Sequence, residues 1–118
     1  MKTVFYKKLS SLHIAIMDLT YCDLIPSCKG YMINRINVPM NVDASGTPLY
    51  RGRGIGSELL RECIADADKE GVRLLLEINA SNGLTREQLE AWYIRHGFKE
   101  HQQYPGLYVR ESKLTAVE

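Results

Sequence analysis

The sequence predicts a single α+β domain built on a mixed central sheet, with its elements in the order β-β-β-α-β-α-β-β. Glycines at alternate positions, Gly52, Gly54 and Gly56, open directly into an amphipathic helix over 55–70. A nearly continuous apolar run over 72–78 follows, which is typical of a strand buried on both faces. With 118 residues the chain has room for one such domain and one modest core.

The elements before the glycines are predicted to be strands. Segments 3–8 and 12–19 are rich in β-branched and apolar residues and form a predicted hairpin. Segment 21–30 contains a proline and a glycine and is predicted to be irregular. Segment 31–38 alternates apolar and more polar residues and is the third predicted strand, which a proline ends.

Both helices have recognisable ends. Gly71 supplies the C-terminal stop of the first helix. Residues 80–83 are predicted to be a turn, and Thr85 with Gln88 three positions later forms a capping box for a second helix. Gly97 ends that helix.

The last predicted elements form a hairpin. Its strands are segments 98–103 and 107–111, joined across a Tyr-Pro-Gly turn. The tail from Ser112 onward is predicted to be frayed.

The glycine-rich turn is also a candidate anion site. Glycine tolerates positive φ and lets a ligand approach the backbone closely. The first-turn N–H groups of the following helix are unpaired and carry partial positive charge, which suits a phosphate. Arg51 and Arg53 add guanidinium donors, which favours a pyrophosphate. The turn lacks the lysine of a P-loop and has Ser57 where a dinucleotide fingerprint needs its third glycine. The alternative is an ordinary turn before a helix.

Composition narrows the class of partner. The formal net charge of +1 predicts no general attraction to nucleic acid or membrane, and no apolar stretch approaches membrane-spanning length or resembles a signal peptide. We therefore expect a cytoplasmic protein. The three cysteines, Cys22, Cys28 and Cys63, lack paired spacing and the three histidines are scattered, so we expect free thiols and no metal site. Cys63 falls on the apolar face of the first predicted helix.

Two motifs resemble those of a known family. Residues 51–56, R-G-R-G-I-G, match the pattern [QR]-x-x-G-x-[GA] at every fixed position. Residues 92–98, W-Y-I-R-H-G-F, place an aromatic pair before Gly-Phe at a helix end. On these motifs, segment 31–109 resembles the GNAT superfamily of acyl-CoA-dependent N-acetyltransferases. It is most similar to small standalone bacterial and phage members that share N-V-P at 37–39 and G-L-T-x-E-Q-L at 83–89.

The resemblance implies a GNAT-like sheet with two splayed parallel strands and acetyl-CoA as co-substrate, without a metal. The pantetheine arm would lie between the strands over 31–38 and 72–78. Main-chain groups near Asn37 and Val38 would pair with it and polarise the thioester carbonyl. The pyrophosphate would be bound by the turn and helix start, that is by Arg51, Gly52, Arg53, Gly54, Ile55, Gly56 and Ser57.

Transfer to an amine needs a base and an acid. A lysine-like amine has a pKa of about 10.4, so a base must help to remove its proton at neutral pH. Glu77 at the end of the second cleft-forming strand is the candidate base; the alternative is a carboxylate that pairs with an arginine or faces solvent. Tyr93 matches the position of the family's tyrosine and would protonate the leaving thiolate; the alternative is a packed aromatic side chain.

The first thirty residues depart from the family pattern. GNAT domains normally begin with a strand and two helices that roof the acceptor site, and a hairpin leaves no room for them. An open site suits a protein or peptide amine, or completion by a second subunit in a homodimer. The rival interpretation is a catalytically degenerate GNAT-like module that binds CoA or a host protein.

Overall fold

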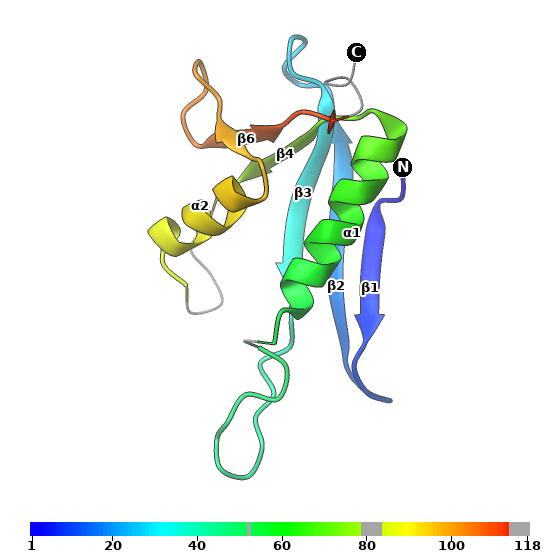
Figure 1. Ribbon diagram of the computed structural model, residues 1–118, viewed down its shortest axis with the longest axis vertical. Coiled ribbons are helices and arrows are strands. Elements are labelled where there is room, and N and C mark those ends of the chain that lie inside the picture. The colour runs from blue at the N-terminus through cyan, green and yellow to red at the C-terminus, as the bar shows by residue number, and fades with distance from the viewer. Residues whose placement is uncertain (52, 79–83, 114–118) are drawn as a thin grey trace.

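The element order matches the prediction. The computed structural model describes residues 1–51, 53–78 and 84–113, so Gly52 and the predicted turn over 80–83 lie outside the described residues. The fold is the expected α+β arrangement of a mixed sheet and two helices (Figure 1). Its elements are β1 (Val4–Lys8), β2 (Ile14–Cys22), β3 (Gly30–Asn37), α1 (Ile55–Glu70), β4 (Leu74–Glu77), α2 (Arg86–Arg95), β5 (Lys99–Glu100) and β6 (Leu107–Arg110).

The sheet contains one parallel pair, and that pair separates early. The strand order is β1-β2-β3-β4-β6-β5, and every neighbouring pair except β3–β4 is antiparallel. Helix α1 connects the two parallel strands. Their pairing is limited to Tyr31 with Leu74 and Met32 with Leu75. Beyond Met32 the two strands diverge, as the splayed pair of the predicted fold requires.

A close backbone contact holds the start of this parallel pair. The Tyr31 N–H donates to the Arg73 carbonyl at 2.9 Å. A Cβ atom at Gly30 would lie 2.5 Å from the same carbonyl oxygen, far inside contact distance. Glycine is therefore required at position 30 for β3 to approach β4.

A bulge in β3 lies where the strands diverge. Leu19 of β2 is opposite Ile33, but Asp18 is opposite Arg35, which leaves Asn34 as the extra residue. Asn34 donates to a threonine hydroxyl of β2, and Arg35 forms an ion pair with Asp18. These two β2 partners are two positions apart and so lie on one face of the sheet. The bulge therefore puts two consecutive β3 residues on that face.

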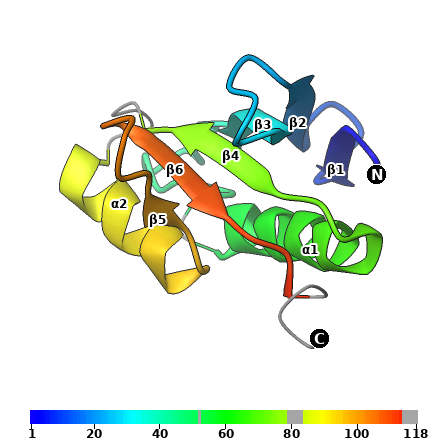
Figure 2. The same cartoon turned by 90° about the horizontal axis from the view of Figure 1, so that it is seen from above.

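Both helices cover the same face of the sheet, as Figure 2 shows. The main core lies between them and the sheet. A smaller cluster occupies the opposite face, where Cys28, from the irregular segment after β2, packs with Leu75 and Leu107. Strand β4 is thus buried on both faces, as predicted from its apolar run. The main core comprises Phe5, Ala15, Met17, Leu19, Ile33, Leu59, Leu60, Cys63, Ala67, Leu74, Leu76, Ile78, Leu89, Phe98 and Tyr108.

The predicted helix ends are confirmed. Helix α1 begins after Gly54 at φ 79° and ends at Gly71 at φ 70°, both in the left-handed region that favours glycine. Helix α2 has the predicted capping box. The Gln88 N–H donates to the Thr85 hydroxyl at 3.1 Å, and the Thr85 N–H donates to the Gln88 side-chain oxygen at 2.9 Å.

The strand bounds agree with the prediction to within one or two residues, except at two strand ends. Strand β2 continues to Cys22, because its last residues pair with the first residues of β3. The predicted strand over 98–103 is reduced to β5, because the His101 N–H donates to the Leu107 carbonyl at 2.7 Å and closes the loop early.

Residues 39–50 form an arm that extends past the end of the sheet (Figure 1). The arm is closed by an isolated bridge between Val42 and Pro48. At its tip the Asp43 carboxylate accepts from the Ser45 N–H at 2.8 Å, and hydrogen bonds from the serine side chain and nearby backbone hold the pKa of that carboxyl below its usual range. The sequence predicts a loop here, and the structure gives it an ordered turn.

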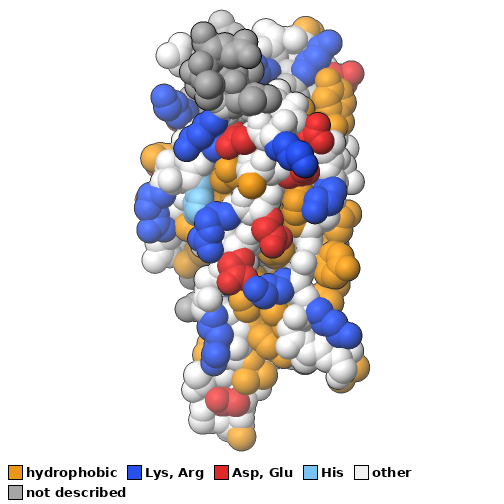
Figure 3. All heavy atoms as spheres, turned by 45° about the vertical axis from the view of Figure 1, so that its right-hand side comes forward, with side chains coloured by type: hydrophobic (Ala, Val, Ile, Leu, Met, Phe, Trp, Pro, Cys, Tyr) orange, Lys and Arg blue, Asp and Glu red, His pale blue; other side chains and the backbone are white. Residues whose placement is uncertain are grey.

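Charges of both signs lie on the surface. On the face in Figure 3, Lys and Arg side chains are interspersed with Asp and Glu side chains. Neither of the two described helices is both long and apolar enough to cross a bilayer. In the described ranges no group of three or more His, Cys, Asp or Glu is placed to hold a metal ion. Burial raises the pKa of the Cys63 thiol to about 12, as expected for a core thiol.

The prediction that the chain frays from Ser112 onward is wrong for Ser112 and Lys113. Arg110 is only 4% exposed, and its guanidinium donates to both carboxylate oxygens of Asp68, at 2.8 and 3.1 Å. The Lys113 N–H donates to the same carboxylate at 2.9 Å, and the Ser112 hydroxyl donates to the Asp68 carbonyl. The end of β6 is thus fastened to the last turns of α1.

Replacing Asp68 with Asn should lower the free energy of unfolding by about 2 kcal/mol, because it leaves the buried Arg110 guanidinium without a charged partner. The hydrogen bond from Arg110 is the largest influence that holds the pKa of Asp68 below its usual range. The stabilisation is therefore complete above the unfolded-state pKa and is lost as pH falls through the folded-state value. Urea unfolding at a series of pH values measures both effects.

The matched control for this variant is Glu62→Gln, at an exposed position of the same helix. We expect it to change the stability by less than about 0.5 kcal/mol. If the difference in the free energy of unfolding between wild type and Asp68→Asn does not shrink towards low pH, the ion-pair explanation is contradicted.

Candidate active site

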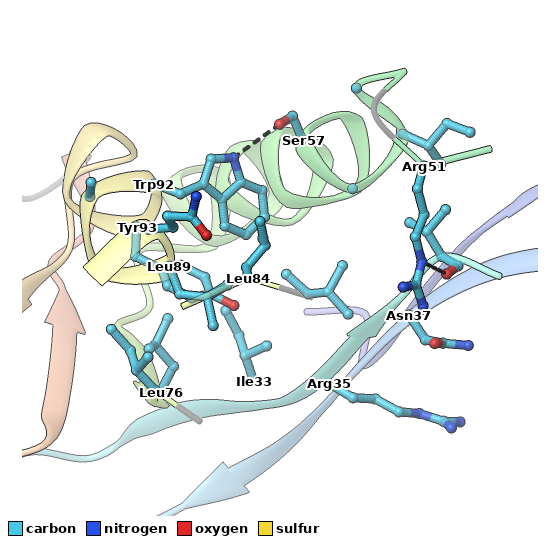
Figure 4. A pocket seen from close by; sticks show the side chains of 18 of the residues that line it. Ile33, Arg35, Asn37, Arg51, Ser57, Leu76, Leu84, Leu89, Trp92 and Tyr93 are labelled. Atoms are coloured by element: carbon cyan, nitrogen blue, oxygen red, sulfur yellow. Dashed lines mark hydrogen bonds between the residues drawn. The ribbon is translucent and has the colours of Figure 1, made fainter. Parts of the chain in front are cut away.

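A cavity of about 1100 Å³ opens where β3 and β4 diverge. Its walls come from β3, the first turn of α1, the end of β4 and helix α2 (Figure 4). Ile33 and Leu76 line it from the strands, whereas Leu89, Trp92 and Tyr93 line it from α2. The cavity thus has an apolar middle and a polar end at α1.

The first turn of α1 forms the polar end. Gly54 precedes the helix and provides no side-chain cap. The first intrahelical hydrogen bond is from the Glu58 N–H to the Gly54 carbonyl at 3.0 Å. The N–H groups of Ile55, Gly56 and Ser57 therefore have no partner among the described residues. All three residues line the cavity, so this end of it can bind an anion.

Different physical constraints act at the two described glycines of the turn. Gly54 needs its left-handed conformation, in which a side chain would be strained. A Cβ at Gly56 would lie 3.8 Å from a methyl group of Ile36 and of Val38, which is ordinary contact. Packing therefore does not require glycine at position 56; its absent side chain leaves room between α1 and β3.

The structure separates the two predicted arginines. Arg51 lines the cavity, and its Nε donates to the Val38 carbonyl at 2.9 Å, which holds the guanidinium at the end of β3. Arg53 is exposed and is not among the described residues that line the cavity. Gly52, between them, lies outside the described residues.

The stretch of β3 main chain that does not pair with β4 is longer than the predicted site at Asn37 and Val38. Asn37 and Val38 both line the cavity. However, Asn37 is opposite Ile16 of β2, and the Val38 carbonyl already accepts a hydrogen bond from Arg51. Pairing with β4 stops at Met32, so main chain without a β4 partner begins several residues before the predicted pair.

Tyr93 is the residue predicted to protonate the leaving thiolate. It lines the cavity from α2 and is half-buried. Its hydroxyl has no hydrogen-bond partner within the described ranges. Burial raises the pKa of Tyr93 to about 12, so the phenol keeps its proton at neutral pH. The hydroxyl can therefore donate to a ligand in the cavity.

Glu77 is the last residue of β4 and also lines the cavity. Its side chain is exposed, and it forms no ion pair with any described residue. The carboxylate is thus available to accept a proton, directly or through water. The structure brings Glu77 and Tyr93 to the same cavity from different elements.

The sequence did not identify two cavity residues. Trp92 lines the cavity and its Nε1 donates to the Ser57 hydroxyl at 3.1 Å, whereas the motif gives it no role of its own. Tyr50 also lines the cavity, and its hydroxyl lies 3.1 Å from Nδ1 of His13, in the β1–β2 turn. No pattern indicates the second contact, because it joins residues far apart in the chain.

Comparison with known proteins agrees with the motifs. Residues 46–100 match the family model described as an acetyltransferase (GNAT) domain. A solved structure, the anti-CRISPR protein AcrVA5, has a similar fold with a TM-score of 0.56 at 17% sequence identity; the match covers 92% of this chain and 98% of that one. A search of curated proteins found no significant match.

The matched segment contains both the glycine-rich turn of α1 and the aromatic pair of α2. The splayed parallel strands and the order of the elements agree with the same family. The family model over residues 46–100 and the shared fold both support a small member of the GNAT superfamily, whose general chemistry is acetyl transfer.

Proposed function

We propose that the protein transfers an acetyl group from acetyl-CoA to a primary amine by direct attack, and that the acceptor is an amine of a protein or peptide. The observation that carries this proposal is one cavity that joins an anion-binding helix start, an open strand edge and the Tyr93 hydroxyl. Its volume of about 1100 Å³ suits a long co-substrate with a charged end.

The residues present fit acetyl-CoA. The unpaired N–H groups of α1, with Ser57 and Arg51, would bind the pyrophosphate. The amide-rich pantetheine arm would lie along β3 beyond Met32, where the strand edge lacks a partner from β4. A main-chain N–H at this edge would stabilise the oxyanion that forms when the thioester carbonyl is attacked.

Glu77 and Tyr93 would move the two protons of the reaction. The neutral amine attacks the thioester carbon, and Glu77 accepts a proton from the amine, directly or through water. The intermediate then collapses, the carbon–sulfur bond breaks, and an amide and a thiolate form. Tyr93 protonates that thiolate, which its raised pKa permits because the phenol is fully protonated beforehand.

The acceptor side supports a large substrate. Only residues 9–13 connect β1 to β2, and they contain no helix, whereas GNAT domains commonly roof the acceptor site with two helices there. An unroofed site is accessible to a side chain on the surface of another protein. Completion of the site by a second copy of the chain remains the competing proposal, and a sedimentation measurement that shows a monomer would dismiss it.

Calorimetry with CoA and acetyl-CoA tests the first half of the proposal, and we expect both to bind. Thiol release from acetyl-CoA with a mixed pool of amines and proteins tests the second half. Mass spectrometry of acetyl-lysine in cells that express the protein would then identify the acceptor. Binding without thiol release in any pool would favour the non-catalytic module, and absence of binding would remove the acetyl-transfer proposal.

A further inference from the structure

Trp92 connects the anion-binding turn to the helix that carries Tyr93. Its indole extends from α2 across the cavity, and Nε1 donates to the Ser57 hydroxyl of α1 at 3.1 Å (Figure 4). In the described part of the chain, no other hydrogen bond joins the two helices. The Trp92 ring also lies 4.9 Å from the Tyr93 ring, centroid to centroid.

The direction of this hydrogen bond determines what Ser57 can do. An indole N–H only donates, so the Ser57 oxygen must accept. The serine hydroxyl still has its own proton to donate. Ser57 lies in the first turn of α1, where the backbone N–H groups also lack partners. The hydroxyl proton is therefore available to an anion at the same helix start.

A chain of two such hydrogen bonds is cooperative, because each bond polarises the next. An anion that accepts from Ser57 makes the serine oxygen a better acceptor for Trp92. The contact between α1 and α2 is then strengthened when the anion is bound. Tyr93, the next residue of α2, is held against the cavity by the same contact.

We propose that Trp92 is a positioning residue that couples phosphate binding at Ser57 to the placement of Tyr93. This inference rests on the proposed function, because it takes the ligand to be CoA. Trp92 touches neither the reacting atoms nor the phosphate in this scheme; it acts through Ser57 at one end and through α2 at the other.

A double-mutant cycle separates coupling from simple packing. We expect Trp92→Phe and Ser57→Ala each to weaken CoA binding by about tenfold, the loss of one hydrogen bond. The double variant should bind no more weakly than either single variant, because both changes break the same chain. Each single variant should also lower kcat, since Tyr93 is less well held. Ile94→Ala, at an exposed position of the same helix, should leave binding and kcat unchanged.

Fluorescence tests the contact without a ligand, because Trp92 is the only tryptophan of the chain. The emission of Ser57→Ala should differ from that of the wild type, and identical spectra would overturn the inference. Additive losses in the cycle, or single variants that bind CoA as tightly as wild type, would also overturn it and leave the proposed function intact. Wild-type protein that does not bind CoA would remove the proposed function and this inference together.

Discussion

Replacing Ser57 with Asp is expected to weaken CoA binding by roughly 100-fold and leave the fold intact. A carboxylate about 5 Å from a phosphate, at an effective dielectric constant of about 20, costs about 3 kcal/mol. The same carboxylate in the first turn of α1 favours the helix, since negative charge there stabilises it by about 0.3–1 kcal/mol. Binding and thermal stability should therefore change in opposite directions, which calorimetry and thermal unfolding measure.

The matched control is Ser57→Asn, because an asparagine side chain has nearly the size of aspartate but no charge. We expect it to bind CoA far more tightly than Ser57→Asp. The difference between the two variants should also narrow at high salt, because charge repulsion is screened. Equal affinities for CoA would show that the phosphates do not lie at the start of α1.

Replacing Tyr93 with Phe is expected to lower kcat by about 100-fold or more, within the range that a general acid contributes. The change removes the hydroxyl alone and keeps the ring, which packs against Trp92 and Phe98. The Kd for CoA should therefore stay near the wild-type value. Steady-state kinetics with the acceptor identified in cells, together with calorimetry, measures the two quantities separately.

The pH dependence provides a second measure of the role of Tyr93. A general acid works while it is protonated, and the pKa of Tyr93 is raised to about 12. The rate should therefore rise with pH as the acceptor amine loses its proton, with no descending limb below about pH 10. A fall in rate between neutral pH and pH 9 in the wild type, absent in Tyr93→Phe, would show that the phenol has a much lower pKa.

The fold was largely predictable because its signals are local. The capping box of Thr85 and Gln88 and the glycines at the ends of α1 depend on neighbours in the chain. Strand ends were less predictable, because they depend on a partner strand. β2 runs on to Cys22 only because β3 lies beside it.

In the candidate site, too, features with local signals were predictable and features that depend on distant residues were not. Gly54, Gly56 and Tyr93 follow from motifs, and the structure places all three at one cavity. The hydrogen bond from Trp92 to Ser57 joins positions 35 residues apart, so no local pattern indicates it. Likewise, the anchoring of Ser112 and Lys113 depends on the carbonyl and the carboxylate of Asp68, more than forty residues away.

Because β3 pairs with β4 over only a short stretch, the sheet consists of two halves joined at a narrow seam, the segment where these two strands pair. Tyr31 and Met32 form that seam, and Gly30 allows its closest approach. A bound molecule with amide groups along β3 would make the main-chain hydrogen bonds that β4 does not make to this strand. The co-substrate would then stabilise the sheet as well as react. In the ligand-free protein, local unfolding would occur most easily where β3 and β4 pair.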